Sequence, residues 1–207
     1  YTVVLGVNED GIDSSHNIIS NASCTTNCLA PMAKIIHENF NIVKGVINTI
    51  HAYTNDQRLA DVSHKDLRRS RAAAENIIPT STGAARAVGK VLPELNGKLD
   101  GIACRVPVPD GSAVDLFVEI EKETNLTEFN HVVKTASQSD RLNNIFEYSE
   151  DPIVSTDIIG NSNSSIYDCS GTSVINGRFL RTLNWYDNEW GYSNRVVNLI
   201  DLLSKFV

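Results

Sequence analysis

The chain has 207 residues, of which 42% are hydrophobic, and a formal net charge of −7 at pH 7. This length allows one large domain or two small ones, and no apolar run approaches the length of a transmembrane helix. The acidic balance argues against nucleic acid as the main partner. The four cysteines lack the paired spacing of a zinc site and are few for a disulfide scaffold, which favours free thiols in a reducing compartment.

The first fifty or so residues predict two strands, a helix and a third strand. A Val-rich stretch at 1–7 and a short apolar segment near Ile18 predict the first two strands. Apolar residues at helical spacing predict a helix from Cys24 to about Asn39, and Val, Ile and Thr in 43–53 predict the next strand. Because the sequence begins without Met in what reads as mid-strand, we expect a piece of a longer protein.

Beyond residue 53, hairpin-linked strands are mixed with separate helices. Residues 54–71 are charged and aperiodic and predict a long excursion from the sheet. The other expected elements are a helix at 83–95, strands at 99–106 and 113–121, a helix at 127–137, strands at 145–148, 165–167, 172–175 and 179–186, and a last helix with Val196, Leu199, Ile200 and Leu203 on one stripe. This mixture predicts an α+β fold rather than repeated βαβ units.

Cys24 begins the first predicted helix, and this position bears on its chemistry. The first turn of a helix has unpaired N–H groups and a partial positive charge, both of which favour a thiolate. Either Ser23 or Asn21 can cap this helix. Cys28 lies one turn further on the same face, where a packed thiol is a more common role than a redox partner. A buried small side chain explains Cys24 equally well when the motif is considered alone.

His51 follows Cys24 by 27 residues, near the end of a strand that would return beside the helix. A neutral imidazole near a thiol can remove a proton, return it, or stabilise an oxyanion. A single histidine in a strand more often has a structural hydrogen-bonding role. The pair therefore indicates catalysis more strongly than either residue does.

Two further groups of residues are typical of ligand binding. The segment Thr80–Gly83 combines hydroxyls, a glycine and a helix start that could hold a phosphate, and four arginines match phosphate oxygens. The arginines are Arg68, Arg69, Arg71 and Arg105. Surface ion pairs with Asp56, Asp61 and Asp66 explain the arginines equally well. The aromatic run Trp185–Tyr192 suits a planar ligand or a packed corner, and no G-x-G-x-x-G motif is present to bind a dinucleotide pyrophosphate.

Five motifs are specific enough in combination to indicate a family. They are Ser23–Cys28, His51–Gln57, Asp66–Arg69, Thr80–Ala85 and Trp185–Tyr192. Together they resemble phosphorylating glyceraldehyde-3-phosphate dehydrogenases. The similarity runs the length of this chain but covers only the C-terminal three-fifths or so of a typical member. It implies a mixed, largely antiparallel sheet covered by helices, with a remnant of the cofactor-binding domain at 1–23, the catalytic domain at 24–187, and at 188–207 a helix that packs on the cofactor-binding domain.

The resemblance also implies a role for each matching residue. Cys24 would be the nucleophile and His51 the base. Positions around the substrate phosphate are Thr54, Asp56 and Arg105. Positions around inorganic phosphate are Ser23, Thr25, Arg69, Thr82 and Gly83. Asn188 would orient the nicotinamide, with Tyr192 beside it.

The implied reaction is the NAD-dependent oxidation of glyceraldehyde 3-phosphate to 1,3-bisphosphoglycerate in glycolysis, through a thiohemiacetal and a thioester on the cysteine. The resemblance further implies a cytoplasmic homotetramer without a membrane or metal partner. Val62-Ser63 replaces a Leu-Pro pair that is common in NAD-using members, so NADP stays an alternative cofactor. Erythrose-4-phosphate dehydrogenase and a non-catalytic thiol-bearing binding module are the alternative functions. Without the glycine fingerprint, we expect the isolated chain to be inactive as a dehydrogenase.

Overall fold

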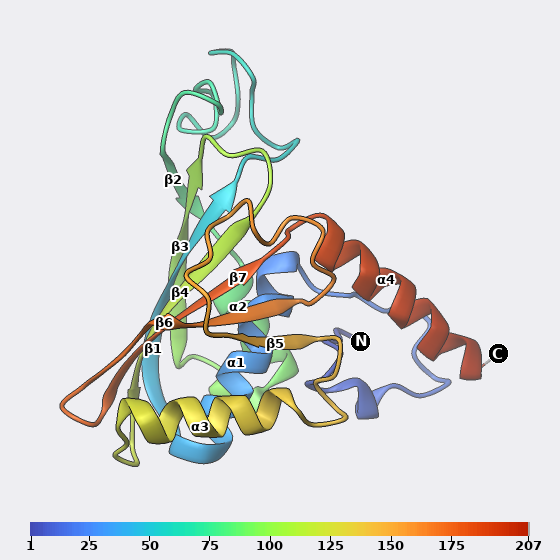
Figure 1. Ribbon diagram of the computed structural model, residues 1–207. Coiled ribbons are helices and arrows are strands. Elements are labelled where there is room, and N and C mark those ends of the chain that lie inside the picture. Colours follow the sequence, from blue (N-terminus) through green and yellow to red (C-terminus); the bar gives the residue numbers. More distant parts are fainter. Residues whose placement is uncertain (207) are drawn as a thin grey trace.

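Seven strands form one mixed sheet, in the order β2-β3-β1-β4-β7-β6-β5, in the computed structural model, which describes residues 1–206 (Figure 1). The strands are β1 (Ile42–Ala52), β2 (Ile78–Ser81), β3 (Leu99–Val106), β4 (Ser112–Ile120), β5 (Phe146–Ser149), β6 (Ser165–Ile175) and β7 (Phe179–Tyr186). The pairs β1/β3 and β5/β6 are parallel, and the other four neighbouring pairs are antiparallel. The predicted α+β class and the mixed, largely antiparallel sheet are confirmed.

Strand β1 lies inside the sheet, between β3 and β4, and carries His51 next to its last residue. Its parallel register with β3 sets His51 directly opposite Arg105. Because parallel strands end at the same edge of a sheet, this pairing brings an imidazole and a guanidinium together at one edge.

Three helices cover one face of the sheet (Figure 1). They are α1 (Cys24–Phe40), α2 (Ala84–Val91) and α3 (Leu126–Ser137). Strand β4 illustrates how the sequence builds this core. From Val114 to Ile120 every second residue is apolar and is buried beneath the helices, as the alternation predicts. These residues are Val114, Leu116, Val118 and Ile120. Burial of each such side chain contributes about 1.5–3 kcal/mol to stability.

The other face of the sheet has no helix over it within residues 1–206 (Figure 1). Apolar side chains from neighbouring strands are exposed there, with 55% of Val46, 50% of Ile102 and 42% of Phe179 accessible to solvent. Together with the half-buried Phe117, these side chains form an apolar patch, here called the open sheet face. Patches of this kind mark interaction surfaces.

The excursion predicted after β1 is present and projects beyond the end of the sheet (Figure 1). Residues 53–77 contain no helix or strand, and a single isolated bridge joins Arg58 to Ala72. Leu59 and Leu67 are each 81% exposed on this loop. The charged, aperiodic sequence lacks an apolar face, so it cannot pack as a regular element.

The observed elements differ from the predicted ones in three places. Neither residues 1–7 nor the segment near Ile18 forms a strand of the sheet: Thr2 makes only a parallel bridge to Ser20, because this region lies away from the sheet. The strands predicted at 165–167 and 172–175 are one strand, β6, with a register shift between Asp168 and Ser173. The short edge strand β2 was not predicted, because its Pro79 is rare in strands except at edges.

The last helix, α4 (Trp190–Leu203), lies beyond the sheet beside the N-terminal segment (Figure 1). The apolar stripe predicted on this helix is partly buried and partly exposed. Leu199 is buried against Val3, Leu5 and Ile12, whereas Ile200 is 62% exposed. Among residues 1–206, no helix combines the length and the apolar character needed to cross a bilayer.

Candidate active site

Cys24 is the first residue of α1, and the preceding residues fix its position. Ser23 is the cap, because its side chain accepts a hydrogen bond from the Thr26 N–H at 3.1 Å. Ala22 has φ 54°, in the left-handed region that residues other than glycine rarely adopt. The chain therefore turns sharply just before the helix and holds the sulfur at a rigid helix start.

The thiol of Cys24 contacts the imidazole of His51. Cys24 Sγ lies 3.5 Å from His51 Nε2, although 27 residues separate them along the chain. The ring is buried, with 4% of the residue exposed, and stands edge-on to the ring of Tyr186 at a centroid distance of 5.8 Å. Sequence reasoning predicted both residues, and the fold brings them into contact.

Two contacts of His51 Nδ1 bear on which tautomer the ring adopts. Nδ1 lies 2.8 Å from the Ala52 carbonyl oxygen, which can only accept a hydrogen bond, and 3.0 Å from Arg105 Nη1, which can only donate. Arg105 Nη1 also donates to the Ala52 carbonyl at 2.9 Å. The Ala52 carbonyl favours a proton on Nδ1, whereas Arg105 favours a proton on Nε2. In the tautomer with the proton on Nδ1, Nε2 can accept a proton from Sγ.

Burial keeps both members of the pair neutral at pH 7. Desolvation and the neighbouring Arg105 charge lower the pKa of His51 from 6.5 to about 4. Desolvation raises the pKa of Cys24 above its ordinary value, against smaller opposing contributions from hydrogen bonds to Thr25 and the charge of Arg105. The helix start alone was expected to favour a thiolate, but burial has the larger effect. The arrangement is a thiol facing a neutral base.

Two cavities meet at this pair. One has a volume of about 410 Å³ and is lined by Thr25, Thr82, Gly83 and Arg105 among others. The second, of about 370 Å³, is lined by Thr54, Asp56, Asn188 and Tyr192 among others. Ala22, Ser23, Cys24 and His51 line both. A molecule in either cavity can therefore reach the sulfur.

The residues that the resemblance grouped by phosphate are distributed differently in space. Arg105 lines the cavity of Thr82 and Gly83, yet it also donates to Thr54 Oγ1 at 3.2 Å and so contacts both groups. Arg69 lines neither cavity. Its guanidinium is held by Asp56 and donates to Thr80 Oγ1 at 2.9 Å.

Asp56 is the acidic centre of this network. Its carboxylate pairs with Arg69, lies 3.7 Å from Arg105 Nη2, and accepts a hydrogen bond from Thr54. Partial burial raises the pKa of Asp56, but the Thr54 hydrogen bond and the charges of Arg105 and Arg69 outweigh burial and lower it. Arg71 likewise makes an ion pair at the surface, with Asp61 at 3.1 Å, as the alternative explanation of the arginines predicts.

Thr82 and Gly83 lie where α2 begins. Thr82 Oγ1 accepts from the Ala84 N–H at 3.2 Å, and no side chain caps the helix at Gly83. A Cβ built on Gly83 would meet nothing within 4 Å, and its φ of −89° is open to any residue. Glycine thus keeps the cavity wall open here rather than serving a turn, and it leaves helix amides available to an anion.

Asn188 is held in one orientation at the second cavity. Ser112 Oγ accepts from the Ala52 N–H at 3.0 Å and donates to Asn188 Oδ1 at 2.7 Å, so the oxygen of the amide is bound to protein. Asn188 Nδ2 is 3.3 Å from Glu189 Oε1. Tyr192 donates to the Ala22 carbonyl at 3.3 Å, beside the kink that precedes Cys24.

Sequence reasoning gave no individual role to three buried residues of this site, although one of them, Tyr186, lies in the aromatic run Trp185–Tyr192. Tyr186 Oη bonds Thr25 Oγ1 at 2.8 Å and Thr49 Oγ1 at 3.0 Å, which ties α1 to β1. Burial raises the pKa of Tyr186 well above its usual range, so it stays a phenol. Thr49 lies two residues before His51 and thus on the same face of β1, a signal available in the sequence. Ser112 carried no comparable signal.

Cys28 is fully buried one turn after Cys24, and its sulfur lies 3.6 Å from Ser165 Oγ. The packed-thiol interpretation is confirmed. All four cysteines are free, and residues 1–206 contain no cluster of three or more His, Cys, Asp or Glu suited to a metal ion.

A family model and several curated relatives match most of this chain. The family model described as "Glyceraldehyde 3-phosphate dehydrogenase, C-terminal domain" matches residues 23–188. "Glyceraldehyde-3-phosphate dehydrogenase 2" of Streptomyces avermitilis is 61% identical over 199 residues, which cover 96% of this chain and 59% of that protein.

Two further relatives extend the match to nearly the whole chain. The glyceraldehyde-3-phosphate dehydrogenase of Borreliella burgdorferi is 58% identical over 99% of this chain and 61% of its own length. That of Mycobacterium tuberculosis is 57% identical over 99% of this chain and 60% of its own length. The chain thus spans about three-fifths of the length of these relatives.

Proposed function

This chain belongs to the glyceraldehyde-3-phosphate dehydrogenase family, and we propose that it carries the catalytic thiol of a phosphorylating aldehyde dehydrogenase. The substrates would be glyceraldehyde 3-phosphate and inorganic phosphate, and the product 1,3-bisphosphoglycerate, in glycolysis. The observation that supports this most directly is the 3.5 Å contact between Cys24 Sγ and His51 Nε2, where two cavities meet.

The first step would be attack of the Cys24 sulfur on the aldehyde carbon. His51 Nε2 accepts the thiol proton as the C–S bond forms, and then returns it to the former carbonyl oxygen to give a thiohemiacetal. Because both groups start neutral, the proton moves only when the aldehyde is in place.

A nicotinamide cofactor, when bound, would supply the acceptor for the hydride that leaves the thiohemiacetal carbon. His51 removes the hydroxyl proton at the same stage, which leaves a thioester on Cys24. The residues fit a carboxamide-bearing ring, because the Asn188 amide lies in the wall of the second cavity with its oxygen fixed by Ser112. Tyr192 lies beside it. We propose NAD as the cofactor, with NADP as the alternative.

The thioester would then be cleaved by inorganic phosphate. The C–S bond breaks as a phosphate oxygen bonds to the acyl carbon, and the sulfur leaves as a thiol after protonation. We propose that Ser23, Thr25, Thr82 and Gly83 bind inorganic phosphate, while Thr54, Asp56 and Arg105 surround the substrate phosphate. Arg69 would act on inorganic phosphate only after leaving Asp56, since that pair holds it away from both cavities.

An activated acyl ester tests the thiol chemistry in this chain without the cofactor. We expect one equivalent of leaving group to be released rapidly, acyl mass to appear on the Cys24 peptide, and phosphate to speed deacylation. Cys24→Ser should abolish the rapid release, whereas Cys28→Ser should retain it. Equal acylation of the Cys24→Ser chain would refute the proposal. We also propose that the chain alone does not turn over NAD, because its sequence has no glycine fingerprint for the pyrophosphate.

We propose three parts: 1–23 and 188–207, which belong with the cofactor-binding domain, and the catalytic domain, 24–187. The family match to 23–188 supports these boundaries. A second, small apolar cluster also supports them: it joins Val3, Leu5 and Ile12 to Leu199, apart from the main core.

We propose a cytoplasmic homotetramer. The open sheet face supports self-association, because Val46, Ile102 and Phe179 expose apolar surface that a partner subunit would bury. The four free cysteines suit a reducing compartment. Sedimentation of the chain at micromolar concentration checks the assembly, and Val46→Lys should weaken it.

A further inference from the structure

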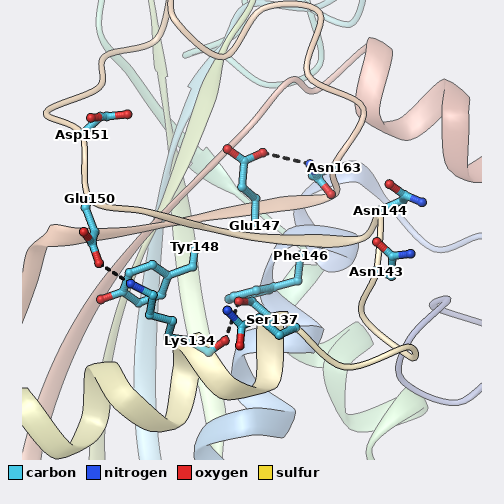
Figure 2. Close-up of a pocket in the computed structure, with 11 residues that line it drawn as sticks. Lys134, Ser137, Asn143, Asn144, Phe146, Glu147, Tyr148, Glu150, Asp151 and Asn163 are labelled. Atoms are coloured by element: carbon cyan, nitrogen blue, oxygen red, sulfur yellow. Dashed lines mark hydrogen bonds and ion pairs between the residues drawn. The ribbon is translucent and has the colours of Figure 1, made fainter.

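A further cavity lies away from Cys24, between the edge strand β5 and helix α3. It has a volume of about 540 Å³, and its lining is polar except for Phe146. The lining residues are Lys134, Ser137, Gln138, Asn143, Asn144, Phe146, Glu147, Tyr148, Glu150, Asp151 and Asn163 (Figure 2). None of them belongs to the site around Cys24, so the proposed dehydrogenase chemistry gives this groove no role.

Strand β5 ends the sheet, so one of its edges has no neighbouring strand. The Ile145 carbonyl accepts from the Ser165 N–H at 3.2 Å, and in a parallel ladder every second residue bonds the same neighbour. Glu147 therefore bonds β6, and the backbone groups of Phe146 and Tyr148 point to the free side. The Phe146 N–H already donates to Leu142. The Phe146 carbonyl and both backbone groups of Tyr148 are left for a further strand.

The two sides of this edge differ in charge. Figure 2 shows Glu147 pointing away from α3, whereas Phe146 and Tyr148 point toward it. On the α3 side, Lys134 Nζ bonds Glu150 Oε1 at 2.6 Å and lies 5.2 Å from the centroid of the Tyr148 ring. This cation and this carboxylate neutralise each other, so the α3 side offers aromatic and neutral polar surface.

The opposite side of the edge is acidic. Glu147 Oε2 accepts from Asn161 Nδ2 at 2.8 Å and from Asn163 Nδ2 at 2.9 Å, and no cation within residues 1–206 pairs with this carboxylate. The exposed Asp151 carboxylate also has no ion-pair partner among residues 1–206. Two unpaired negative charges thus lie beside an unpaired strand edge.

We propose that this groove binds an extended peptide segment of alternating basic and apolar residues, which adds a strand to β5. Such a segment would bond the backbone of Tyr148 and would place alternate side chains on the two sides of the edge. Its lysine or arginine side chains would meet Glu147 and Asp151, and its apolar side chains would pack on the half-buried Tyr148. Phe146 is only 3% exposed and supports this surface from the core. β5 has only four residues, so the backbone contributes few bonds and the charges supply much of the selectivity.

The test uses the full 207-residue chain and a fluorescein-labelled peptide of alternating lysine and valine, with binding followed by fluorescence anisotropy. We expect saturable binding and slower amide hydrogen exchange at Tyr148. The double variant Glu147→Gln, Asp151→Asn should weaken binding about tenfold, because it removes both charges while leaving an oxygen to accept from Asn161 and Asn163. Glu94→Gln, an exposed charge removed beside α2, is the matched control and should have no effect.

Two altered peptides separate charge from backbone pairing. The alternating glutamate–valine peptide should not bind, and the lysine peptide with N-methylated valines should lose binding because it cannot pair with an edge. Equal binding to the wild-type chain and the double variant would overturn the proposal, since the peptide would then sit elsewhere on the acidic surface. Undiminished binding of the N-methylated peptide would also overturn it, as would sedimentation showing that a second copy of the chain occupies the edge.

Discussion

Cys24 and Cys28 lie one turn apart on the same face of α1, yet their surroundings differ completely. Cys24 meets His51 Nε2 at 3.5 Å and lines two cavities. Cys28 has no exposed surface, and its sulfur faces Ser165 Oγ and the carbonyls of Asn184 and Trp185. Both thiols lie in the first two turns of the same helix, so position near a helix end does not by itself separate a reactive thiol from an inert one.

The pKa shifts of the two thiols support the same conclusion. Desolvation raises the pKa of both thiols, and at Cys28 no nearby cation opposes it. At Cys24, hydrogen bonds to Thr25 and the charge of Arg105 oppose desolvation. What distinguishes Cys24 is a base within reach and space for a substrate, rather than a standing negative charge on sulfur.

The largest expected effect is the difference in alkylation between the two thiols. Iodoacetamide should modify Cys24 about a thousandfold faster than Cys28, because Cys28 reacts only after α1 opens locally. Peptide mass mapping over time measures both rates in one sample. In urea-unfolded chain the two rates should converge. Comparable rates in the folded chain would contradict the difference in accessibility between Cys24 and Cys28.

The second prediction concerns the base. His51→Gln should slow acylation of Cys24 by an activated ester by about 10² to 10⁴, since a neutral amide cannot accept the thiol proton. Stopped-flow release of the leaving group measures this rate. His131→Gln, an exposed histidine on α3, is the control and should match the wild-type chain. An unchanged rate in His51→Gln would mean that the thiol reacts without the imidazole.

The third prediction uses pH to probe the same ring. The pKa of His51 is about 4 in the folded chain against 6.5 in its ordinary state, so the unfolded chain binds a proton first as pH falls. The contribution to stability is complete above pH 6.5 and is lost progressively between 6.5 and about 4, up to about 3 kcal/mol. Urea unfolding across this range measures it. In His51→Gln this part of the slope should vanish, and its persistence would assign it to another group.

The smallest expected effect concerns the phenol beside the pair. Tyr186→Phe removes the hydroxyl that bridges Thr25 and Thr49 and should cost about 1–3 kcal/mol of stability, because two buried hydroxyls lose a partner. Tyr53→Phe, whose residue is only half buried, serves as the control. Urea unfolding at pH 7 compares the two variants. A loss no greater than in Tyr53→Phe would show that the bridge contributes nothing to anchoring Cys24.

Much of the fold could be read from periodicity. Strand β4 alternates apolar and polar residues, and the apolar stripe after Cys24 predicts α1, so both were predicted close to their observed bounds. Residues 1–7 have the composition of a strand but make only one bridge, because composition does not say whether a partner strand is present. Register could not be predicted at all, and it is register that sets His51 opposite Arg105.

The sequence by itself determined that a thiol begins a capped helix and that an imidazole ends a strand, because caps and periodicities depend on residues a few positions apart. Only the tertiary structure decided that these two groups touch, that burial keeps both neutral, and that Arg69 is engaged by Asp56 instead of lining a cavity. The physical reason is that desolvation and charge pairing depend on through-space neighbours, which come from segments far apart in the chain.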